Sequence, residues 1–102
     1  MNIQVPVAFQ LRIELQALSN ALLRATSDRL KLLRLAESAL TTAESSGLGD
    51  ATLRGRLRVL RDTLLRDLPV DRADASAVFR RLAGTVDVAA RESVRQGAAL
   101  AR

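Results

Sequence analysis

The stretch ESSGLGDATLRGRLRVLR, residues 44–61, interrupts a long helical pattern and decides the fold of this 102-residue chain. Gly47 suits the left-handed conformation in which many helices end. Gly49 loosens the corner, and Asp50 is a favourable N-cap for a following helix. The stretch therefore predicts a corner between one helix that ends at residue 46 and another that begins at residue 51. It leaves open whether the arginines after the corner bind a nucleic acid or only form a solvated helix face.

The segment before the corner, residues 7–46, contains neither Gly nor Pro and has apolar residues at heptad spacing. The members of this heptad seam are Leu11, Leu15, Leu18, Leu22, Ala25, Leu32, Ala36, Ala39 and Ala43. Arg29 is the one position that departs from the seam. We predict a short tail, residues 1–6, and then one helix of about 60 Å over residues 7–46. The alternative is a break at Thr26-Ser27-Asp28, where Ser27 would cap a second segment.

Two further helices are predicted after the corner. Helix 51–67 places four leucines on one face, namely Leu53, Leu57, Leu60 and Leu64. Pro69 ends it, because the residue before a proline avoids helical backbone angles. Asp71 is a favourable N-cap for a helix over residues 72–101, whose apolar face consists of Ala75, Val78, Phe79, Leu82, Val86, Ala89, Ala90 and Leu100. Residues 7–102 are thus predicted to be one all-α domain, an antiparallel bundle of three helices with a long first helix and coiled-coil-like packing.

The residue types that are missing exclude much of enzyme chemistry. The chain has no Cys and no His, which excludes disulfides, thiolate nucleophiles and the usual zinc sites. General acid–base catalysis at neutral pH commonly uses His or a carboxylate with a shifted pKa. The closest carboxylate pair, Asp71 and Asp74, is better explained as helix capping, and the only lysine, Lys31, lies amid Leu and Arg. We therefore expect a non-enzymatic protein with no catalytic residues, no metal and no cofactor.

The apolar surface of the predicted first helix exceeds what its shorter neighbours would cover. A second stripe of Leu23, Leu30, Leu33 and Leu40 runs beside the seam, which indicates contact with at least two other helices. Most of these residues are expected to form an ordinary core, and the remainder to associate with a second copy of the chain, as a homodimer, or with a helical partner. The residues predicted to form this docking ridge are Leu11, Leu15, Leu18, Leu22, Leu30 and Leu33. The predicted function is that of a helical interaction protein: an adaptor, a chaperone or a secretion partner.

The basic residues support a different class of function, nucleic-acid binding. The net charge is +5, and Arg54, Arg58 and Arg61 form a stripe at i, i+4 and i+7 that suits a phosphate backbone. Asp62 follows Arg58 by four residues, so ion pairing within the helix would weaken the positive field. No aromatic residue near the stripe is available for base stacking, because Phe9 and Phe79 are the only aromatic residues. The stripe is therefore interpreted first as a solvated face, second as a nucleic-acid site and third as a surface that attracts an acidic protein.

The beginning of the chain and the corner together resemble a bacterial family. Ile3-Gln4-Val5 and the corner Gly47-Leu48-Gly49 resemble the layout of the WXG-type helical hairpins that type VII secretion systems export. The resemblance covers residues 3–65, lacks the Trp of the corner motif, and implies a co-secreted, dimeric helical partner without enzymatic activity. The N-terminus has no basic region ahead of its apolar part, and no uncharged run approaches the roughly 20 residues of a membrane span. We expect a cytoplasmic protein, or one exported without a classical signal peptide.

Overall fold

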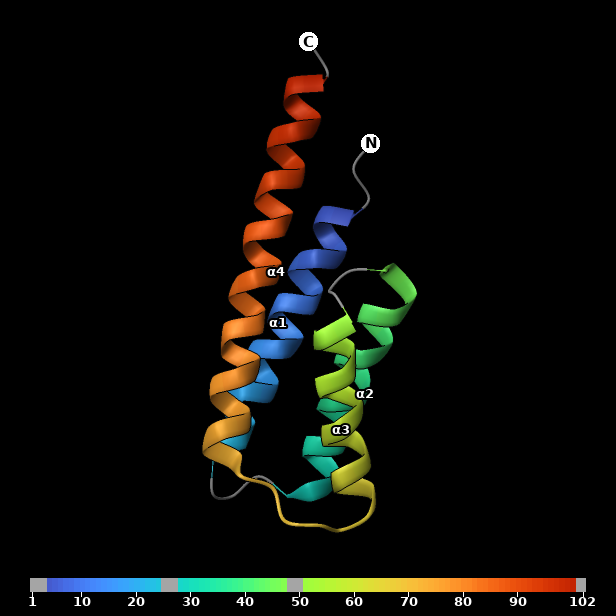
Figure 1. Cartoon of the computed structure of the whole chain (residues 1–102), viewed down its shortest axis with the longest axis vertical. Coiled ribbons are helices and arrows are strands. Elements are labelled where there is room, and N and C mark those ends of the chain that lie inside the picture. Colours follow the sequence, from blue (N-terminus) through green and yellow to red (C-terminus); the bar gives the residue numbers. More distant parts are fainter. Residues whose placement is uncertain (1–3, 25–27, 48–50, 101–102) are drawn as a thin grey trace.

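The computed structural model describes residues 4–24, 28–47 and 51–100, with residues 4–6, 89–90 and 92–100 described by their backbone alone. It contains four helices, α1 (Gln4–Leu23), α2 (Arg29–Ser46), α3 (Ala51–Leu65) and α4 (Arg72–Leu100) (Figure 1). The predicted all-α class is confirmed. The predicted tail is wrong from residue 4 onward, because α1 already begins at Gln4 and contains Pro6 in its first turn, where a missing N–H costs nothing.

The prediction of one helix over residues 7–46 is also wrong, because this segment forms two helices, α1 and α2. Asp28 has extended backbone angles, and its Oδ1 accepts a hydrogen bond of 2.7 Å from the Lys31 backbone N–H. This N-cap satisfies an N–H group at the start of α2 that would otherwise lack a partner. The break lies where the alternative placed it, although the observed cap is Asp28, and Ser27 lies outside the described residues. A three-helix bundle therefore becomes a four-helix bundle.

The corner and the later helices agree closely with the expected pattern. Gly47 adopts the left-handed conformation at φ +69°, while Gly49 and Asp50 lie outside the described residues. Helix α3 ends at Leu65, two residues before its predicted end. Helix α4 covers nearly all of the predicted segment, and in Figure 1 its C-terminal part extends past the start of α1.

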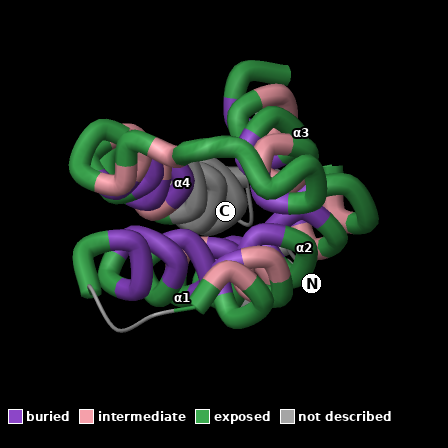
Figure 2. Tube along the Cα trace, turned by 90° about the horizontal axis from the view of Figure 1, so that it is seen from below, coloured by how far each residue is buried: buried purple, intermediate pink, exposed green. Residues whose placement is uncertain are grey.

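The core lies along three helix–helix interfaces. Within the described residues, extensive packing joins α1 to α4, α1 to α2, and α2 to α3. Figure 2 shows the buried segments of these helices turned toward one another. Every described residue of the predicted heptad seam is buried, as are Leu53, Leu57, Leu60 and Leu64 of α3. Helices α3 and α4 are consecutive in the chain, yet they are not among the extensively packed pairs.

Candidate docking groove between helices α3 and α4

The side chain of Arg29 attaches the end of α3 to the start of α2. Its Nη2 donates hydrogen bonds to the backbone carbonyl oxygens of Thr63 at 3.1 Å, Leu64 at 3.4 Å and Leu68 at 2.7 Å. Its Nε lies 3.0 Å from Oδ1 of Asp67, as an ion pair rather than a directed hydrogen bond. A guanidinium at a helix C-terminus is favourable because the last carbonyl groups carry partial negative charge. The residue that departs from the heptad seam thus positions α3 against α2.

The last turn of α3 closes in a Schellman motif. The backbone N–H of Asp67 donates to the carbonyl oxygen of Leu64 at 3.2 Å, and that of Leu68 donates to Thr63 at 3.1 Å. Asp67 has a φ of 56°, the left-handed conformation that this motif requires at the position after the helix. Pro69 follows and prevents the helix from continuing. The chain therefore leaves α3 in a fixed direction before α4 begins.

Helix α4 is held by α1 rather than by α3. The hydroxyl groups of Ser19 and Ser76 are buried, lie 2.9 Å apart, and each donates to the backbone carbonyl oxygen of the other residue. At the same end of the bundle, Nη1 of Arg72 donates to the carbonyl oxygen of Arg24 at 2.9 Å. Because α3 is attached to α2 and α4 to α1, a space remains between α3 and α4.

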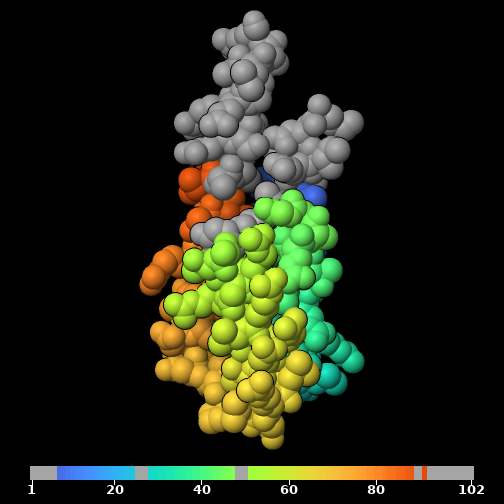
Figure 3. All heavy atoms as spheres, turned by 45° about the vertical axis from the view of Figure 1, so that its right-hand side comes forward, coloured from blue at the N-terminus to red at the C-terminus, as the bar shows by residue number. Residues whose placement is uncertain are grey.

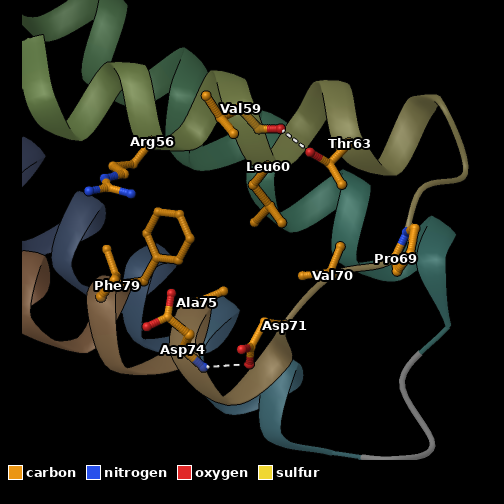
Figure 4. Close-up of a pocket in the computed structure, with 11 residues that line it drawn as sticks. Arg56, Val59, Leu60, Thr63, Pro69, Val70, Asp71, Asp74, Ala75 and Phe79 are labelled. Carbon is orange, nitrogen blue, oxygen red and sulfur yellow. Dashed lines mark hydrogen bonds between the residues drawn. The ribbon is translucent and has the colours of Figure 1, made fainter.

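This space is an apolar groove of about 200 Å³ (Figure 4). The apolar residues that line it are Val59, Leu60, Pro69, Val70, Ala75, Val78 and Phe79. Phe79 and Leu60 are buried and form the floor, whereas Val59 is 65% exposed. In Figure 3 the lime and yellow atoms of α3 and the orange atoms of α4 appear on the same face of the molecule. The groove therefore offers apolar side chains to a ligand that approaches this face.

The two walls of the groove carry opposite charges. Arg56 belongs to the α3 wall, while Asp71 and Asp74 belong to the α4 wall. Figure 4 shows Arg56 and Asp74 on either side of Phe79. The carboxylate of Asp71 caps α4 by accepting a hydrogen bond of 3.1 Å from the Asp74 backbone N–H, as its predicted capping role requires. Arg56 and Asp74 are exposed, and neither side chain has an ion pair within the described part of the chain.

The predicted docking ridge does not form one accessible surface. Four of its leucines, Leu11, Leu15, Leu18 and Leu22, are at most 1% exposed, because the other helices of the same chain cover α1. Leu33 is partly buried against the core, and only Leu30 is exposed, at 56%. The expected surplus of apolar surface depended on a single long helix. Once α2 folds back along α1, most of that surface becomes internal.

The predicted arginine stripe on α3 is divided among different partners. Nε and Nη2 of Arg58 both donate to Oε1 of Glu44, at 3.2 and 2.8 Å. Nε of Arg61 donates to Oδ1 of Asp62 at 3.2 Å. Arg54 lines a shallow hollow beside Arg58 and Glu44. Two of the three guanidinium groups therefore already face carboxylates, and a phosphate would have to compete with them.

The carboxylate of Glu14 on α1, which is also buried, has a structural explanation. Its carboxylate accepts hydrogen bonds from the hydroxyl groups of Ser38 at 2.6 Å and Thr42 at 2.7 Å, both on α2. Across the residues searched, namely those that the structure describes, no cluster of three or more His, Cys, Asp or Glu residues is arranged to hold a metal ion. None of the described helices is both long enough and apolar enough to cross a bilayer.

Sequence reasoning did not find the groove, although two of its residues carried a signal. Val59 is an apolar residue that lies off the leucine face of its helix, between Arg58 and Leu60, and Phe79 is one of only two aromatic residues. No protein-family model, no curated protein and no solved structure matches the chain. The chemistry of the groove's own side chains therefore has to identify its ligand.

Proposed function

We propose that this protein is a non-enzymatic helical interaction module whose docking surface is the groove between α3 and α4. The observation that carries the proposal is the exposure of Val59, at 65%, beside a pocket whose floor is formed by Leu60 and Phe79. An exposed apolar hollow with charged edges is typical of a protein–protein contact.

The shape of the groove favours a helix as its ligand. Its walls are two helices that do not pack tightly against each other, so the open side of the bundle accepts further helical surface. An amphipathic helix binds such a groove by inserting side chains spaced three and four residues apart. Binding would be driven by burial of apolar area, which contributes about 25 cal/mol per Å², and the charged walls would set the orientation of the ligand.

The groove does not favour catalysis. Asp71 already caps α4 through its contact with the Asp74 N–H, and the apolar floor holds no nucleophile. Whether the module acts as an adaptor, a chaperone or a secretion partner depends on the protein that it binds, and the resemblance to WXG-type hairpins supports the last of these.

Photocrosslinking in the native host tests the proposal. Val59 is replaced by a photoreactive phenylalanine analogue in the full chain, and the same analogue replaces Thr41, an exposed residue of α2, as the control. We expect irradiation to give a covalent protein adduct from position 59 and none from position 41. A chain that forms no adduct at position 59, or equal adducts at both positions, contradicts the proposal.

A further inference from the structure

We propose that the ligand of the groove is the same groove of a second copy of this chain, in a two-fold dimer in which Arg56 of each protomer faces Asp74 of the other. The inference rests on the proposed function and specifies the partner. It follows from the charges of the two walls, from the distribution of apolar side chains between them, and from a comparison with an exposed apolar surface of α1.

The charges make the groove complementary to itself. The α3 wall carries Arg56 and the α4 wall carries Asp71 and Asp74. A two-fold axis that lies in the plane of the groove mouth and runs along the groove turns the second protomer to face the first, so α3 of one protomer lies over α4 of the other. This rotation brings each positive wall onto a negative wall, and it does so twice in one interface. Arg56 and Asp74, which have no ion pair within the described part of their own chain, gain one in the dimer.

The apolar side chains are distributed in the same self-complementary way. Val59 projects from the α3 wall, whereas Phe79 and Ala75 line the pocket on the α4 side. The same rotation that pairs the charges places Val59 of each protomer toward the pocket of the other. The dimer thus has an apolar centre and charged edges, which is the usual composition of a protein–protein interface.

An exposed apolar surface on α1 is less suitable. Phe9 and Ile13 of α1 are 44% and 54% exposed. However, the guanidinium of Arg12 lies 5.5 Å from the centre of the Phe9 ring, as a cation–π contact, and 3.6 Å from Asp87 of α4. Two of the charges at this face are therefore already paired within the chain. The groove combines exposed apolar surface with the charges of Arg56 and Asp74, which have no ion pair among the residues that the structure describes.

A charge-swap experiment on the full chain tests the dimer. Molar mass is measured by light scattering after size-exclusion chromatography, for the parent chain and for Arg56→Asp, Asp74→Arg and the double variant. Arg34→Asp, on an exposed residue of α2, is the matched control. Circular dichroism establishes that each variant retains its helical content.

We expect the parent chain and the Arg34→Asp control to be dimers. Each single variant places like charges opposite each other twice, so we expect its self-association to weaken by at least about tenfold. The two single variants, mixed in equal amounts, should form a one-to-one heterodimer, because every contact between them then joins opposite charges. The double variant should recover the homodimer for the same reason.

Other outcomes separate the two proposals. A parent chain that stays monomeric at all accessible concentrations, with position 59 crosslinking to a different protein, overturns the dimer and supports the proposed function. A monomer without any adduct at position 59 overturns both. A dimer that persists in the single variants, or that mixing does not restore, overturns the pairing of Arg56 with Asp74.

Discussion

Ser19 and Ser76, 57 residues apart in the chain, each donate a hydroxyl hydrogen bond to the backbone carbonyl oxygen of the other, at 3.0 and 2.9 Å. Both side chains are only 1% exposed, so the two helices approach closely at this point. The pair holds α4 against α1 and thereby keeps α4 away from α3. The groove thus depends on two small polar residues at the interface of α1 and α4.

Removing one of these hydroxyl groups should destabilise the fold modestly. We expect Ser76→Ala to lower the free energy of unfolding by about 1 kcal/mol, because one buried hydrogen bond is lost. The double variant Ser19→Ala/Ser76→Ala should cost less than the sum of the single variants, since no hydroxyl is then left without its partner. Urea denaturation measures these values, and Ser45→Ala, at an exposed position, is the control. Strictly additive costs would contradict a mutual pair.

The attachment of Arg29 to α3 should matter more than an ordinary surface arginine. We expect Arg29→Ala to cost about 1–2 kcal/mol, because the guanidinium satisfies carbonyl groups at the end of α3 and is itself partly exposed. Lysine should not substitute fully, because a single ammonium lacks the planar set of donors. Arg34→Ala, on an exposed residue of α2, should change stability by no more than about 0.5 kcal/mol. Equal losses at positions 29 and 34 would refute the assigned role.

Asp67 offers a stabilising substitution. Its φ of 56° is unfavourable for a residue with a side chain, while its carboxylate is 87% exposed and contributes little through Arg29. We expect Asp67→Gly to raise the free energy of unfolding by as much as about 1 kcal/mol, and Asp67→Ala to lower it. Thermal or urea unfolding distinguishes the signs. A loss of stability in the glycine variant would mean that the ion pair outweighs the backbone strain.

The arginine stripe of α3 should bind duplex DNA only weakly. Three free phosphate contacts predict a slope near −2.7 when the logarithm of the binding constant is plotted against that of salt concentration. Because Arg58 and Arg61 already contact Glu44 and Asp62, we expect a shallower slope. Fluorescence anisotropy of a labelled duplex across a salt series measures it. A slope of −2.7 or steeper, reduced by Arg54→Ala, would instead support the nucleic-acid alternative.

The periodic pattern of apolar residues correctly predicted helical structure and the core residues, but it did not predict the number of helices. The seam continues through the break because Leu22 and Leu32, on either side of it, both face the same core. The polar stretch Thr26-Ser27-Asp28 and the off-pattern Arg29 marked the discontinuity, but the function of Arg29 depends on carbonyl groups that come more than thirty positions later. The pattern of apolar residues along one helix does not indicate which distant carbonyl groups a polar side chain will contact.

The groove could not be predicted for a related reason. The leucine face of α3 was correctly assigned to the core, but the same pattern is compatible with packing against α1, α2 or α4. The space appears only because α3 packs on α2 and α4 on α1. Because of this packing, Val59 and Arg56 line the same groove as Phe79. The sequence of a single helix does not indicate which other helix it packs against.

The contact between Glu14 and the hydroxyl groups of Ser38 and Thr42 limits how the first hairpin can assemble. A seam of leucine and alanine tolerates sliding by one helical turn, since each apolar side chain would meet a similar neighbour. A charged oxygen pair has less freedom, because a shift of about 5.4 Å would separate it from one of its two hydroxyl donors. This carboxylate therefore favours one alignment of α1 and α2 among several whose apolar contacts are nearly equal.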